Sequence, residues 1–158
     1  MFNMKELKEI IIGQGIGSII FGMTKDELKE VAGKPDETEQ YNYDDSEEFN
    51  AESWHYDSLE LSVAFEEEND WKLSNIAVSS PGYLFNGKKL IGLTKDEVVK
   101  EIKGMELGTL EVEDCSSDDD PNLSVISFDE SALNLWFDEG ILTEIQWGIL
   151  WEEDDDAN

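Results

Sequence analysis

The chain has 158 residues, of which 39% are apolar, and it contains five tryptophans, four tyrosines and seven phenylalanines. These residues suffice for the core of one compact domain or of two small, closely packed halves. Eleven basic residues against thirty-nine acidic ones give a net charge of −28. Such a surface repels nucleic acids and anionic membranes, and attracts basic partners or cations.

Three further features bear on the compartment. Cys115 is the only cysteine, so an internal disulfide is excluded and a reducing compartment is expected. Residues 1–7 mix charges and lack a long apolar run before a small-residue cleavage site. No window approaches eighteen apolar residues, the length of a membrane span. We expect a soluble cytoplasmic protein.

The first predicted element is a helix over residues 4–12, where apolar residues recur at helical spacing before Gly13. A second helix is predicted near residues 25–32. Thr24 and Glu27 have the spacing of a capping box at its start, and Gly33 is suited to end it.

Strand-like segments follow. Residues 37–43 place Tyr41 and Tyr43 on one face, an acidic loop over 44–48 separates them from 54–56, and 59–65 alternate strictly. A last strand is expected over 72–78.

The second half of the chain corresponds to the first. Residues 91–98 repeat the pattern of 21–28, including Thr94 and Glu97 as a second capping box. Without gaps, 126–137 align with 54–65, and 141–147 match 72–78, while 109–113 supply the counterpart of the first strand.

This order predicts an α+β fold of two tandem repeats. Each repeat is a capped helix packed on an antiparallel sheet of about four strands, with an open sheet face opposite the helices. The first repeat is expected over 1–81, including the extra N-terminal helix, the second over 82–151, and an acidic tail over 152–158.

Two hairpin registers are available in the second repeat. A two-residue loop, Glu139-Gly140, pairs Phe137 with Leu142. A three-residue loop that includes Asp138 pairs Phe137 with Ile141 and gives one continuous apolar face, so we favour the three-residue loop.

The favoured register predicts which residues occupy the open face. We expect it to carry a partner-binding set, with Trp71 at the tip of a long acidic loop and His55 across from Glu60. Tryptophans surrounded by acids are typical of binding hot spots within a polar rim, and burial by neighbouring loops is the alternative for Trp71, Trp136 and Trp151. The predicted partner-binding residues are Trp71, Leu73, Trp136, Leu142, Glu144, Asp44, Asp45, Glu47, Glu48, His55 and Glu60.

Other motifs do not indicate chemistry. The glycines between residues 13 and 17 do not form a nucleotide-binding loop. Residues 118–122 resemble the start of a calcium loop, but Leu123 replaces the required glycine and Asp129 the bidentate glutamate. Acidic neighbours disfavour the thiolate of Cys115. We therefore expect no catalytic residue, no metal site and no cofactor, and a surface ion pair for His55 in preference to general-base catalysis.

The stretch from Ile20 to Leu28, with the ending Gly33-Lys34-Pro35, resembles small bacterial domains. They include the outer-membrane-assembly lipoprotein family and the tandem-repeat β-lactamase inhibitor proteins. The resemblance implies helix-plus-four-stranded-sheet repeats whose concave sheet grips a protein. The lipidated cysteine of the former and the disulfides of the latter are absent. In acidity and size the chain is also similar to immunity proteins of bacterial toxin systems.

The predicted function is a non-enzymatic inhibitor or immunity protein that binds a basic protein, such as a nuclease toxin. The alternatives are a structural assembly module related to the lipoprotein domain, and an enzyme or cation-binding protein that uses the acidic loops. The oligomeric state stays open.

Overall fold

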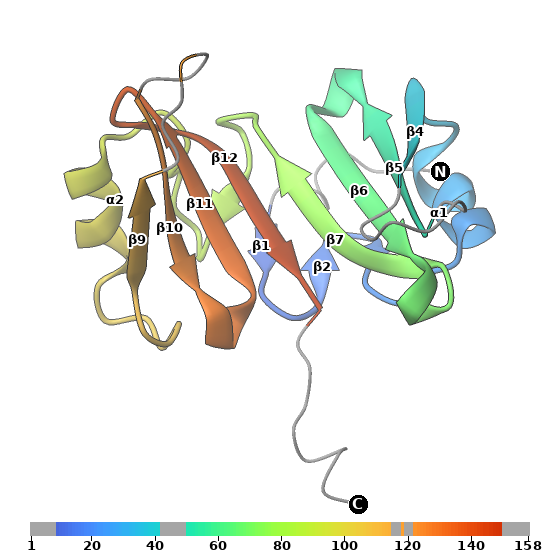
Figure 1. Cartoon of the computed structure of the whole chain (residues 1–158), viewed down its shortest axis with the longest axis horizontal. Helices are drawn as coiled ribbons and strands as arrows, with labels where there is room; N and C mark the ends of the chain where they lie inside the picture. The colour runs from blue at the N-terminus through green and yellow to red at the C-terminus, as the bar shows by residue number, and fades with distance from the viewer. Residues whose placement is uncertain (1–8, 42–49, 115–117, 119–121, 150–158) are drawn as a thin grey trace, which may run out of the picture.

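The computed structural model describes residues 9–41, 50–114, 118 and 122–149. Two α-helices and twelve strands occur in this part of the chain (Figure 1). In chain order they are β1 (Glu9–Ile11), β2 (Gly15–Ile16), β3 (Ile19–Ile20), α1 (Lys25–Ala32), β4 (Glu37–Tyr41), β5 (Ala51–Tyr56), β6 (Leu61–Glu66), β7 (Lys72–Val78), β8 (Leu84–Phe85), α2 (Lys95–Ile102), β9 (Glu111–Asp114), β10 (Leu123–Phe128), β11 (Leu133–Asp138) and β12 (Ile141–Gly148).

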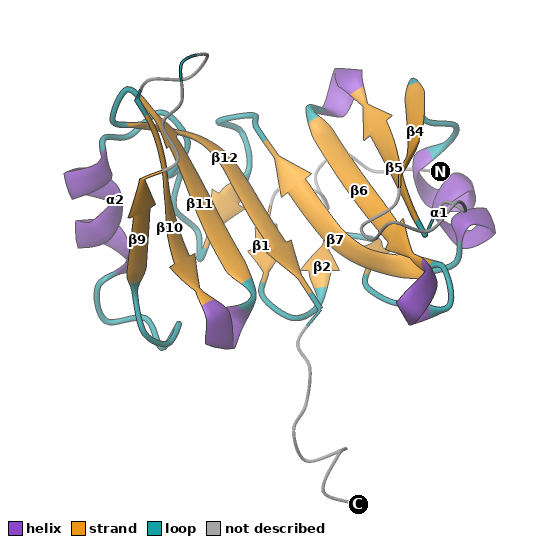
Figure 2. Cartoon of the chain, in the orientation of Figure 1, coloured by secondary structure: helices purple, strands orange, loops and turns teal. Residues whose placement is uncertain are grey.

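Eight strands form one antiparallel sheet in the order β4-β5-β6-β7-β12-β11-β10-β9 (Figure 2). A small mixed sheet has the order β3-β2-β1-β8. The expected α+β fold of two repeats, each with its own four-stranded sheet, is therefore wrong. The structure is mostly β, and β7 and β12 join all eight strands. Ile76 lies opposite Trp147, and Val78 opposite Ile145. Joining these strands pairs two backbone edges that would otherwise stay open beside apolar side chains.

The predicted helix over 4–12 is also wrong from Glu9 onward, where the chain forms β1; residues 1–8 lie outside the described part. Ile10 pairs with Ile16 on β2 and with Phe85 on β8. Consecutive β-branched residues favour a strand over a helix. Gly15 allows the tight return, because a Cβ there would lie 2.1 Å from the carbonyl oxygen of Ile19.

Both predicted capping boxes are confirmed. Thr24 Oγ1 accepts from the Glu27 N–H at 3.2 Å, and Glu27 Oε1 accepts from the Thr24 N–H at 2.9 Å. Thr94 and Glu97 make the same two bonds at the same distances. The helices therefore start where the sequence predicts, at residues 25 and 95.

The favoured three-residue hairpin is wrong. Glu139 and Gly140 form a two-residue loop with φ values of 54° and 82°, and Asp138 pairs with Ile141. Positive φ at both positions is what the common two-residue hairpin turn requires. Phe137 then lies opposite Leu142, the alternative register that the sequence also allows.

A β-bulge reconciles this register with an apolar face. Pairing shifts between Trp136 and Phe137, so Thr143 is the extra residue and Glu144 lies opposite Trp136. The same shift occurs on β7, where Phe65 pairs with Leu73. Leu73 and Leu142 are thus 1% and 0% exposed, in the core, and their predicted place on the open face is wrong.

The core lies on one face of the eight-stranded sheet. Leu28 of α1, Val98 and Ile102 of α2, and Ile10 and Ile16 of the small sheet share one apolar cluster with that face. The other face carries mainly polar or small side chains and is called the open face below. None of the described helices is long and apolar enough to cross a membrane.

Candidate partner-binding face

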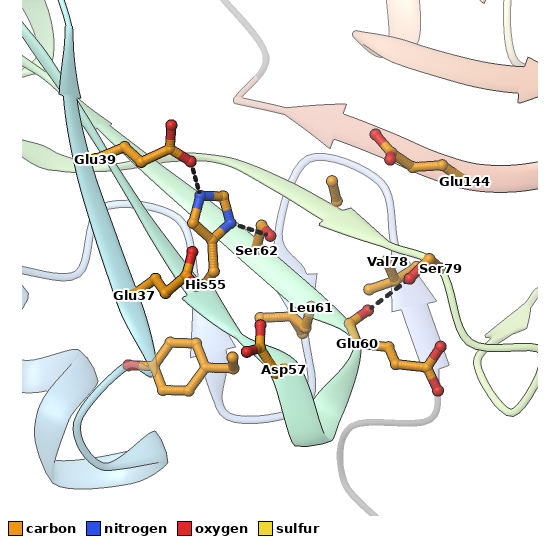
Figure 3. Close-up of a pocket in the computed structure, with 12 residues that line it drawn as sticks. Glu37, Glu39, His55, Asp57, Glu60, Leu61, Ser62, Val78, Ser79 and Glu144 are labelled. Atoms are coloured by element: carbon orange, nitrogen blue, oxygen red, sulfur yellow. Dashed lines mark hydrogen bonds and ion pairs between the residues drawn. The ribbon is translucent and has the colours of Figure 1, made fainter.

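A cleft of about 400 Å³ occupies the open face over β4, β5, β6 and β7 and reaches β12 (Figure 3). The cleft is strongly acidic. Its floor includes Ser62 and Ala77, two small side chains that it shares with a second hollow of about 130 Å³. The carboxylates that line it are those of Glu37, Glu39, Asp57, Glu60 and Glu144.

His55 stands in the wall of this cleft between two partners. Its Nε2 lies 2.7 Å from Glu39 Oε1, and its Nδ1 lies 2.7 Å from Ser62 Oγ. A carboxylate only accepts, so a neutral His55 donates its Nε2–H to Glu39 and accepts a hydrogen bond from the Ser62 hydroxyl at Nδ1. The expected Glu60 partner is wrong, because His55 lies opposite Ser62 and Glu37 in the ladders.

Hydrogen bonds link the Ser62, His55 and Glu39 side chains in that order. The same order of hydroxyl, imidazole and carboxylate occurs where a histidine activates a serine nucleophile. Acyl transfer also needs donors aimed at the oxyanion that develops. Here the surrounding side chains include Glu37 and Glu60, whose negative charges oppose an oxyanion. The same charges favour a bound cation, so the cleft suits a lysine or arginine side chain better than a reacting ester.

Glu144 and Trp136 lie on the open face and face each other across β11 and β12. Burial raises the pKa of the Glu144 carboxyl above its usual value. The Trp136 ring is half-buried, and its Nε1–H donates to Gln146 Oε1 at 3.1 Å. A desolvated carboxylate beside an aromatic ring is an arrangement that attracts cations.

Trp71 does not stand at an exposed loop tip, contrary to prediction. A turn of 3₁₀-helix, Glu67–Asn69, and two left-handed residues, Asp70 and Trp71, fold the loop back. The ring packs against the core, with Lys25 Nζ 4.8 Å from its centroid. Trp71 therefore belongs to the face opposite the cleft.

Several predicted residues lie outside the described part of the chain. They are Asp44, Asp45, Glu47, Glu48, Cys115 and Trp151. Among the residues described, no group of three or more His, Cys, Asp or Glu side chains is placed to hold a metal ion.

Sequence reasoning missed Glu37, Glu39 and Ser62. Part of the signal was available, because a strand over residues 37–43 places Glu37 and Glu39 on one face. The missing information was which strands pair and in which register.

Comparisons with known proteins are few. No family model matches the chain, and no curated protein matches it. A solved structure does: the 1.5 Å crystal structure of an extracellular protein containing an SCP domain from Bacillus anthracis str. Ames. The TM-score is 0.53 at 15% identity, over 94% of this chain and 48% of that one. The chain thus spans about half the length of that protein, and the likeness is one of fold alone.

Proposed function

We propose that the chain is a non-enzymatic binding protein that neutralises or regulates a basic protein, such as a toxin, through the open face of its sheet. The observation that carries this is the cleft of about 400 Å³ walled by five carboxylates on that face. A cytoplasmic location, expected from the single cysteine, is part of the same proposal.

Electrostatics support a basic partner. A net charge of −28 speeds encounter with a basic protein and makes association sensitive to salt. Within the cleft, a lysine or arginine side chain would reach Glu144 while its stem covers Ala77. Such a cation would stabilise the ionised form of Glu144, whose pKa burial raises.

The acidic wall also favours binding over catalysis. Attack of Ser62 on a substrate carbonyl would develop an oxyanion on the substrate among Glu37, Glu60 and Glu144, where negative charge is disfavoured. The His55–Ser62 and His55–Glu39 hydrogen bonds serve, in this proposal, to hold the imidazole against the cleft wall.

The test is capture of partners by the immobilised full chain from lysate of the native host, at about 50 mM and 500 mM salt. We expect a basic protein to be retained at low salt and released at high salt. Glu144→Gln should weaken its binding about tenfold, the order expected for losing a partly buried ion pair.

Glu30→Gln is the matched control, since it removes the same charge from the exposed side of α1. The proposal would be contradicted if the two variants bound the captured protein with equal affinity. It would also be contradicted by recovery of an acidic partner whose binding does not depend on salt concentration.

A further inference from the structure

β9 is an outer strand of the eight-stranded sheet, with β10 as its neighbour, and β4 lies at the opposite end. The outer strand of a sheet is where an extended segment of another protein can pair. The two end strands occupy corresponding places, so their side chains can be compared position by position.

β9 carries one apolar residue, Val112, between Glu111 and Glu113, and ends with Asp114. Val112 lies opposite Ile126, on the core-facing side, yet it is 58% exposed, and Leu110, two residues earlier, is 40% exposed. On the open face, Glu111 lies opposite Ser127. Val112 has the largest exposed fraction among the exposed large apolar side chains of the described residues, and it lies in an acidic strand.

β4 has the same acidic face without the apolar one. Glu37 lies opposite His55 on the open face, whereas Thr38, opposite Trp54, occupies the place that Val112 has on β9. A polar residue is therefore compatible with this position at a sheet end. The end strand of the sheet therefore does not need an apolar residue at the position of Val112.

We propose that β9 is the edge on which the partner docks, through an extended segment that alternates basic and apolar residues. The inference rests on the proposed function for the basic character of the partner, and adds strand pairing as the docking mode. Apolar residues of the segment would cover Val112 and Leu110, and basic ones would face Glu111. A second copy of the chain fits poorly, because its own β9 would set acidic side chains against Glu111.

The probe is a capped nine-residue peptide of alternating lysine and valine, compared with a peptide of identical composition in which the lysines and valines form two blocks. Calorimetry on the full chain should give roughly tenfold tighter binding of the alternating peptide, as two additional apolar cross-strand contacts predict. Amide exchange in residues 111–114 should slow on binding. Methylating the backbone nitrogens along the pairing edge of the peptide should abolish its advantage.

Val112→Lys should remove the preference for the alternating peptide, and the fold should persist because Val112 is exposed. Thr38→Lys adds the same charge at the corresponding place on β4 and should leave the preference intact.

Equal binding of both peptides, binding of neither, or equal effects of the two variants would overturn docking at β9. The proposed function is judged separately, by whether Glu144→Gln releases the captured basic protein. If Glu144→Gln weakens capture of the basic protein while Val112→Lys leaves the peptide preference unchanged, binding at the cleft is supported and docking at β9 is contradicted.

Discussion

The two halves of the eight-stranded sheet share a backbone pattern but differ on the open face. Next to the bulge in the partner strand, β6 carries Ala64 opposite Asn75, whereas β11 carries Trp136 opposite Glu144. The first half is hollow where Ala64 lies, and the second half presents a ring at the matching place. At an unchanged register, side-chain size at this position therefore distinguishes the open faces of the two halves.

The core-facing side shows no such difference. The Leu73 N–H donates to Met23 O at 2.8 Å, and its carbonyl accepts from the Gly22 N–H at 2.9 Å. Leu142 bonds to Leu93 and Gly92 in the same way, at 2.9 and 2.8 Å. In both halves the bulged strand thus fixes the segment that starts the helix.

The largest expected effect tests this equivalence of the core sides. Leu73→Ala and Leu142→Ala should each lower the free energy of unfolding by about 3 kcal/mol, the usual cost of a cavity in a packed core. Urea denaturation measures the loss. A loss below about 0.5 kcal/mol, typical of surface sites, would place either residue back on the open face.

Filling the hollow should remove the difference between the open faces. Ala64→Trp gives β6 the residue that β11 has, and should weaken retention of a basic partner about tenfold, by blocking the hollow next to the cleft. Surface plasmon resonance with the captured partner measures this. Trp136→Phe is the control, because it keeps a ring on β11; equal retention by wild type and Ala64→Trp would contradict the role of the hollow.

The capping boxes should be equivalent in energy as they are in geometry. Thr24→Ala and Thr94→Ala should each cost about 1 kcal/mol of stability, since each leaves a helix N–H without its acceptor. Chemical denaturation of both variants checks this, with Thr→Ser at each position as the conservative control. A cost at one site only would show that the two helices contribute unequally.

The smallest effect concerns pH. Because the pKa of Glu144 is raised in the folded state, the folded chain holds this proton more tightly than the unfolded chain does. The free energy of unfolding should therefore fall as the pH rises from 4.5, the usual pKa of a glutamate, through the raised pKa of Glu144 in the folded chain. Glu144→Gln should be slightly more stable than Glu30→Gln at pH 7, with the difference gone below pH 4.5. Thermal melts across this range measure it, and a difference independent of pH would contradict the assignment to Glu144.

The sequence by itself determined the local features. Thr24, Glu27, Thr94 and Glu97 define both helix starts, because a capping box is made by residues three apart. The alternation in residues 59–65 likewise indicated a half-buried strand, and the structure has β6 from Leu61 to Glu66, after a 3₁₀ turn that ends at Leu59.

Tertiary structure decided everything that depends on contacts between distant residues. A single extra residue at Thr143 reverses which side chains face the core, and strict alternation carries no sign of it. The pairing of β7 with β12 merges the strands into one sheet, and the pairing of β4 with β5 brings Glu39 to His55. Side-chain pattern fixes the faces of a strand, but its neighbours and register are set by the packing of the whole chain.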